Sequence, residues 1–143
     1  MNTVTVKNLL RVLLDTNILI SAVVFGGKPD EVLSLALEGK FGVVISPILS
    51  VELLDVVNKK FPLSKNDFRL LERQLKSTFE IVNPTESIDI LKDTADNRVL
   101  EAAIEGKCDY IVTGDKELLR LKVFEGVKIV TAERFLDELK IED

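Results

Sequence analysis

The sequence contains no histidine, no tryptophan and only one cysteine among its 143 residues. The lack of histidine excludes Ser-His-Asp and Cys-His hydrolases and any zinc site that needs a histidine ligand. The single cysteine, Cys108, excludes an internal disulfide and a cysteine-rich zinc site, and no histidine is present to activate its thiol. If the protein is an enzyme, its carboxylates, lysines or hydroxyls must carry the chemistry.

Long apolar runs are also missing. No stretch approaches the roughly 20 apolar residues of a membrane span, and the start of the chain does not resemble a signal peptide. We therefore expect a cytoplasmic protein with no membrane partner. The net charge is −5, from 19 basic and 24 acidic residues. This balance argues against a purely electrostatic nucleic-acid binder, but not against a nuclease whose acidic site is neutralised by metal ions before the substrate arrives.

Short apolar runs alternate with helical patterns along the whole chain. The length and the 46% hydrophobic content suit one domain over residues 1–143, with a lead-in at 1–10 and a core at about 11–139. Apolar runs without alternation predict buried strands at residues 11–14, 41–45, 80–82, 109–113 and 127–130. Apolar residues at helical spacing predict helices at residues 17–25, 28–39, 47–60, 64–79, 92–106, 116–120 and 132–139. This order predicts an α/β fold, a three-layer α/β/α sandwich with a mostly parallel central sheet of four to five strands.

Acidic residues follow two of the predicted strands. Asp15 comes directly after the first strand, and Asp115 follows the fourth. Because the carboxyl ends of parallel strands meet at one edge of a sheet, we expect these two side chains to lie near each other. Asp96 stands near the start of the helix that packs beside them, and Glu52 projects from the third helix among leucines and valines. Simpler interpretations remain open, with Asp15 as a helix cap and Glu52 on the polar side of an amphipathic helix.

Four carboxylates in one pocket would repel each other strongly unless a cation compensates them. Oxygen ligands suit a hard divalent ion such as Mg²⁺ or Mn²⁺. Ions held by carboxylates can activate a water molecule and stabilise the leaving oxygen in phosphodiester hydrolysis. The acidic residues therefore favour metal-dependent phosphodiester chemistry, which needs no histidine base.

Four segments together make the chain resemble the PIN-domain nucleases, small metal-dependent ribonucleases with a FEN-like α/β fold. The segments are LLDTNILISA, SPILSVELLDVV, DTADNRVLEAAIEGKCDYIVTGD and KIVTAERFLDEL, in this order along the chain. The resemblance extends from Arg11 to Leu139. The stretches DTNILISAVVFGGKP and CDYIVTGD make the chain more similar to the toxin–antitoxin PIN subgroup of VapC-like ribonucleases than to the shortest toxins of the family.

The resemblance implies a role for individual side chains. The catalytic and metal-binding residues would be Asp15, Glu52, Asp96 and Asp115. Asn17 and Thr113 would be supporting polar groups that orient a metal-bound water or the carboxylates. Asp93 is either an accessory carboxylate or the N-cap of the helix that follows, and we favour the cap. Arg98 and Lys116 could contact substrate phosphate, although ordinary surface charges are the preferred interpretation.

Relatives of this kind act as RNA-cleaving toxins of toxin–antitoxin pairs and form homodimers. The resemblance therefore implies an RNA substrate, Mg²⁺ or Mn²⁺ as cofactor, an antitoxin partner and a homodimer. The main alternative is a catalytically silent PIN-like module that binds RNA or protein. A phosphatase-like enzyme would need a second acid two residues after its nucleophilic aspartate, where this chain has Asn17. A flavodoxin-like protein would need a glycine-rich loop between strand and helix, which is missing.

Overall fold

The computed structural model describes residues 9–61 and 63–142. Most of the lead-in predicted at residues 1–10 lies outside the described residues. The strands are β1 (Arg11–Leu14), β2 (Gly42–Ile45), β3 (Phe79–Ile81), β4 (Tyr110–Val112), β5 (Val123–Phe124) and β6 (Val127–Val130). The helices are α1 (Thr16–Phe25), α2 (Gly27–Leu37), α3 (Pro47–Lys60), α4 (Lys65–Thr78), α5 (Thr94–Glu105), α6 (Lys116–Leu121) and α7 (Ala132–Glu142).

One sheet of six strands in the order β3-β2-β1-β4-β6-β5 forms the centre of the molecule. Strands β1, β2, β3, β4 and β6 are parallel, and β5 pairs antiparallel with β6. On the central strand β1, Leu13 lies opposite Val44 of β2 and Ile111 of β4, and each of these side chains is at most 1% exposed. Burial on both faces explains why these strands are continuously apolar in the sequence.

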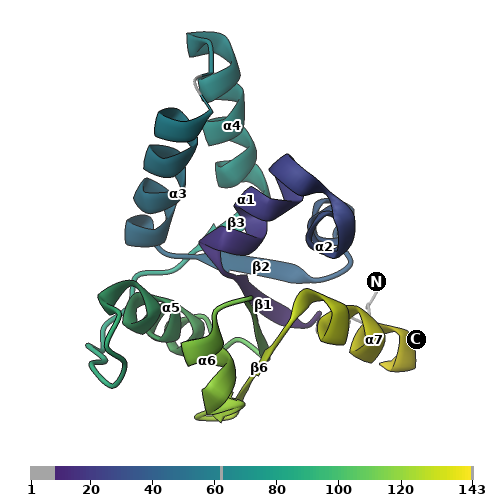
Figure 1. The fold of residues 1–143 in the computed structure, drawn as a ribbon, viewed down its shortest axis with the longest axis vertical. Coiled ribbons are helices and arrows are strands. Elements are labelled where there is room, and N and C mark those ends of the chain that lie inside the picture. Colours follow the sequence, from purple (N-terminus) through teal and green to yellow (C-terminus); the bar gives the residue numbers. More distant parts are fainter. Residues whose placement is uncertain (1–8, 62, 143) are drawn as a thin grey trace, which may run out of the picture.

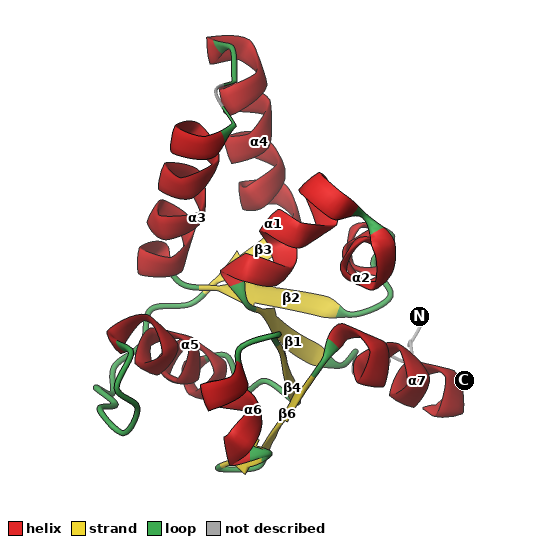
Figure 2. Ribbon diagram, in the orientation of Figure 1, coloured by secondary structure: helices red, strands yellow, loops and turns green. Residues whose placement is uncertain are grey.

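Helices cover both faces of the sheet, which gives the predicted three layers. Figures 1 and 2 show α1, α2 and α7 on one face and α5 and α6 on the other. The pair α3 and α4 stands beside α1 and extends beyond the β3 end of the sheet (Figure 1). Among the described residues, no helix is both long and apolar enough to cross a membrane.

The sheet has one strand more than the predicted four to five. The additional strand, β5, is only two residues long and forms a hairpin with β6 across Glu125 and Gly126. Both turn residues have positive φ, 47° and 85°, as a two-residue hairpin turn of type I′ requires. A strand of two residues is too short to show a hydrophobic pattern in the sequence. Glutamate is also not one of the usual signals for this turn, so the sequence did not reveal the strand.

The chain order of the strands places a switch point beside β1. From β1 the chain builds outward through β2 and β3 on one side, and then returns to add β4 and β6 on the other side. In open α/β sheets, ligands bind at the carboxyl ends of the strands where the order reverses. Asp15 follows β1 and Asp115 lies shortly after β4, so the two acids flank this point.

Candidate active site

Asp15 lies directly after β1 and is held by the neighbouring strand β4. Thr113 Oγ1 donates a hydrogen bond of 2.7 Å to Asp15 Oδ2, and Asp15 N donates to Val112 O at 3.0 Å. Asp15 occupies the N-cap position of α1, but its side chain makes no capping hydrogen bond. The residue is only 7% exposed. Its carboxylate is therefore held at the end of the sheet by Thr113.

The environment of Asp15 opposes its ionisation. Burial raises the pKa of Asp15, the hydroxyl of Thr113 and the backbone amides of Asn17 and Thr16 lower it, and the charge of Asp115 raises it. Asn17 acts here through its backbone, and its side chain is exposed to solvent. The supporting role predicted for the Asn17 side chain stays a prediction.

Asp115 combines a position at the site with a structural task. Its backbone N donates to Thr113 Oγ1 at 2.9 Å, so Thr113 connects Asp115 to Asp15. Asp115 Oδ1 accepts hydrogen bonds from Glu117 N at 2.8 Å and Leu118 N at 3.1 Å, and thereby caps α6. Aspartate directly before a helix is a recognised capping signal, so this role of Asp115 could have been found from its position in the sequence. The cap fixes the orientation of the carboxylate through one of its two oxygens.

Two aspartates, Asp93 and Asp96, lie at the N-terminal end of α5. Asp93 is the N-cap, because its Oδ1 accepts a hydrogen bond from Ala95 N at 2.9 Å, and this confirms the interpretation favoured from the sequence. Asp96 lies in the first turn, is 6% exposed, and its buried Oδ2 has no hydrogen-bond partner among the described residues. Burial together with the charges of Asp115, Asp93 and Asp15 raises the pKa of Asp96 to about 7.

Glu52 reaches the same region from the middle of α3. It is half-buried, and burial followed by the charge of Asp15 raises its pKa. A hydrogen bond from the Thr16 side chain lowers the pKa, and the charge of Asp93 raises it. Because Glu52 interacts with residues after β1 and before α5, it does not lie on a purely solvated helix face.

The four carboxylates therefore lie near enough to influence one another, at the carboxyl edge of the sheet. Asp15 interacts electrostatically with Asp115, Glu52 and Asp96, and Asp96 also interacts with Asp115. In residues 9–61 and 63–142, however, no three acidic or cysteine side chains are close enough to hold one ion together. The donor set consists of oxygen atoms, and the unpartnered Asp96 Oδ2 lies among like charges. This chemistry fits a hard divalent cation, which would replace repulsion by coordination.

The two basic residues considered for phosphate binding have different surroundings. Arg98 Nη2 donates to Ile88 O at 3.0 Å and forms a salt bridge of 2.9 Å with Glu101. Arg98 is thus not a free surface charge, because its guanidinium holds the loop before α5. Lys116, the first residue of α6, is exposed next to Asp115.

Two buried polar residues of α5 were not identified from the sequence. Asn97 is 1% exposed and Glu101 is 8% exposed. Both accept hydrogen bonds from backbone amides of the loop between β3 and α5. Their only signal is the spacing of four residues, which places both on one face of the helix beside the apolar stripe. The sequence does not show what lies against that face.

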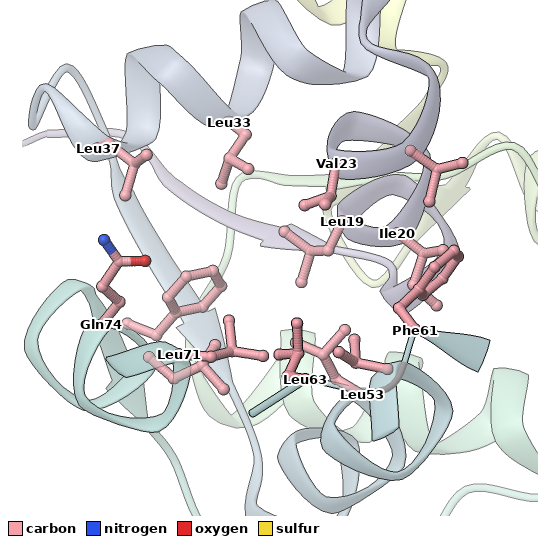
Figure 3. Close-up of a pocket in the computed structure, with 14 residues that line it drawn as sticks. Leu19, Ile20, Val23, Leu33, Leu37, Leu53, Phe61, Leu63, Leu71 and Gln74 are labelled. Atoms are coloured by element: carbon pink, nitrogen blue, oxygen red, sulfur yellow. The ribbon is translucent and has the colours of Figure 1, made fainter. Parts of the chain in front are cut away.

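An apolar pocket of about 220 Å³ lies elsewhere, between α1, α2, α3 and α4 (Figure 3). Apolar side chains line it, with Gln74 as its polar member, and Leu19, Leu33, Leu53 and Leu71 point into it in Figure 3. No carboxylate lines this pocket. It therefore offers no group that could bind a cation or activate water, and the chemistry belongs to the carboxyl edge of the sheet.

Comparisons with known proteins identify the fold and the family of the chain. The uncharacterized protein MJ1680 of Methanocaldococcus jannaschii is 28% identical over 144 residues, covering 92% of each chain. VapBC2 from Rickettsia felis, crystallised bound to a DNA fragment from its promoter, has a TM-score of 0.58 at 19% identity, covering 84% of this chain and 97% of the other. The PIN domain endonuclease Utp24 has a TM-score of 0.52 at 22% identity, covering 87% and 86%. These structural likenesses show a shared fold.

The sequence profile of the PIN domain matches residues 11–117. The matched region contains Asp15, Glu52, Asp96 and Asp115, together with strands β1 to β4. It covers well over half of the chain, and proteins of this family are typically nucleases. The chain belongs to the PIN domain family.

Proposed function

We propose that the protein is a Mg²⁺- or Mn²⁺-dependent endoribonuclease that hydrolyses RNA phosphodiester bonds at the carboxyl edge of its sheet. The observation that carries this proposal is Asp96. Its carboxyl group is buried next to Asp15 and Asp115, and one of its oxygens has no partner. Such a group costs free energy in a protein without a ligand, and a cation would offset that cost. Membership in the PIN domain family and the fold shared with an endonuclease support the same conclusion.

The ion would be held by Asp15, Glu52, Asp96 and Asp115, and when bound it supplies a polarised water and stabilises the leaving oxygen. The protein itself contributes orientation. Thr113 fixes Asp15 through Oδ2, and the cap on α6 fixes Asp115 through Oδ1. The side chain of Thr16 lies close enough to Glu52 to lower its pKa, and therefore favours the charged form of that carboxyl group. Asp96 must be deprotonated to act as a ligand, so ion binding is accompanied by proton release.

The test is cleavage of single-stranded RNA with and without Mn²⁺, beside an Asp15→Asn variant. Asp30→Asn is the matched control, because Asp30 is an exposed aspartate in the first turn of α2. We expect metal-dependent cleavage that Asp15→Asn abolishes and Asp30→Asn retains. Tight RNA binding without cleavage in any divalent metal would instead favour the catalytically silent module that binds RNA or protein.

The biological role is part of the same proposal. We assign the protein to the VapC-like toxins of toxin–antitoxin pairs, acting in the cytoplasm as a homodimer with an antitoxin partner, and built as one domain over residues 1–143. The fold shared with VapBC2, a complex crystallised on its promoter DNA, supports this assignment. Light scattering of the purified chain tests the homodimer. Expression in growing cells, beside Asp15→Asn, tests toxicity, and growth unaffected by the active protein would contradict the toxin role.

A further inference from the structure

The loop between β3 and α5, residues 82–93, contains no helix or strand. Side chains of α5 hold it along its length. Glu105 Oε1 accepts from Thr85 N at 3.0 Å, and Glu101 Oε2 accepts from Ile88 N at 2.8 Å. The loop is therefore fixed by the helix that follows it, and its last residues lead directly into the first turn of α5.

Asn97 provides the contact nearest to that first turn. Its Oδ1 accepts hydrogen bonds from Ile90 N at 3.1 Å and Leu91 N at 2.9 Å, and its Nδ2 donates to Leu91 O at 2.8 Å. The Asn97 side chain is almost fully buried, so water has little access to the bonds from the side of the helix. Two residues after Leu91, Asp93 caps the helix. The amide of Asn97 therefore fixes the path of the chain into the cap.

Asp96 depends on this path for its own position. Its Oδ2 has no donor, so no hydrogen bond to that oxygen holds the carboxylate in place. Its backbone N donates to Asp93 O at 3.1 Å, which ties the first turn to the cap residue. A shift of the loop at residues 90–91 would be transmitted through Asp93 to Asp96. The distance from Asp96 to Asp15 and Asp115 would then change.

We infer that Asn97 is a positioning residue for the metal site, because it locks the loop at Ile90 and Leu91 so that the first turn of α5 presents Asp96 to Asp15 and Asp115. This inference rests on the proposed function. Side chains that orient metal ligands without touching the metal typically change its affinity by about 10- to 100-fold when removed. Asn97 would thus act on metal affinity and not on the chemical step.

The experiment compares Asn97→Ala with Glu105→Ala. Both variants release the same loop from the same helix, but Glu105 holds its far end at Thr85. Mn²⁺ affinity is measured by calorimetry, and amide hydrogen exchange at Ile90 and Leu91 is measured by NMR on the metal-free protein. For Asn97→Ala we expect faster exchange at both amides, Mn²⁺ affinity weakened at least tenfold, and cleavage that recovers at saturating Mn²⁺. Glu105→Ala is expected to match the wild type in Mn²⁺ affinity.

The outcomes separate the two proposals. Asn97→Ala that exchanges faster but binds Mn²⁺ like the wild type overturns the positioning role and leaves the nuclease proposal intact. A wild type that neither binds Mn²⁺ nor cleaves RNA overturns the proposed function itself. If Asn97→Ala does not fold, Asn97→Leu is used, since leucine keeps the branched arrangement of the side-chain heavy atoms and removes all three hydrogen bonds.

Discussion

Asp96→Asn should make the protein more stable at neutral pH while removing its activity. Burial and the neighbouring carboxylates raise the pKa of Asp96 from 3.8 to about 7. The folded state therefore binds more protons than the unfolded state between these values, so the stability of the wild type falls as pH rises through this window. Asparagine resembles the neutral acid and has no charge to bury. The variant avoids the free-energy cost of burying a charged carboxylate, which the wild type bears in full above about pH 7.

The size of this penalty follows from the shift. A change of about 3 pKa units corresponds to at most about 4 kcal/mol. The carboxyl group borders the open edge of the sheet, and screening by solvent reduces this to about 2 kcal/mol. For a chain of this length, about 2 kcal/mol corresponds to a rise in Tm of roughly 6 °C. The gain in the free energy of unfolding of Asp96→Asn over the wild type should be present at pH 8 and nearly vanish at pH 4.

Urea unfolding without metal at pH 4, 6 and 8 measures this effect. Asp67→Asn is the matched control, because Asp67 is also in the first turn of a helix but is exposed. Removing the charge of Asp67 should lower the free energy of unfolding by about 0.5 kcal/mol, because the charge interacts favourably with the helix dipole. The control should therefore not become more stable than the wild type at high pH. If Asp96→Asn were less stable than the wild type at pH 8, or its advantage did not grow with pH, the argument that Asp96 is a buried, strained carboxylate would be refuted. In the presence of Mn²⁺ the wild type should gain stability and the variant much less.

Two further results are expected. Thr113→Val keeps the shape of the side chain but removes its bonds to Asp15 and Asp115, so we expect the free energy of unfolding in urea to fall by about 2 kcal/mol and RNA cleavage to slow at least tenfold. The control Thr131→Val removes the bond to Arg134 N at α7, and it should lose stability but keep its cleavage rate. Equal losses of activity in the two variants would contradict the role of Thr113. Burial raises the pKa of the Cys108 thiol to about 12, so iodoacetamide at pH 8 should label this thiol slowly in the folded protein and rapidly in urea. Fast labelling of the folded protein would contradict this prediction, because it would show that the thiol is accessible.

The layout of the sheet could be predicted because burial itself determines the sequence pattern. Val12, Leu13 and Ile111 are fully buried between two layers of helices, so β1 and β4 had to be continuously apolar. The positions of Asp15 and Asp115 at the carboxyl ends followed from the same pattern. Strand β5 could not be found in this way, since its two residues are held by a turn and by one neighbouring strand.

The internal order of the site was not predictable, because it depends on contacts between distant parts of the chain. The bond between Thr113 and Asp15 joins residues 98 positions apart. Asn97 bonds to the backbone atoms of Ile90 and Leu91, and backbone groups carry no sequence signal. One of the two partners of Arg98, the carbonyl of Ile88, is hidden from the sequence for the same reason, so Arg98 resembled an ordinary surface charge. Sequence patterns showed which carboxylates arrive at the edge, but not what holds them there.

The pairing of β1 with β4 has a consequence for folding. The hydrogen bond from Thr113 to Asp15 exists only when these two distant strands are side by side. Contacts between such remote segments form slowly, since closing the chain between them costs entropy before the contact is gained. A fragment that lacks β1 or β4 cannot place Asp15 beside Thr113 in this way. Enzymatic activity should therefore return only with the final cooperative phase of refolding, and a single proteolytic cut that lets β4 separate should abolish it.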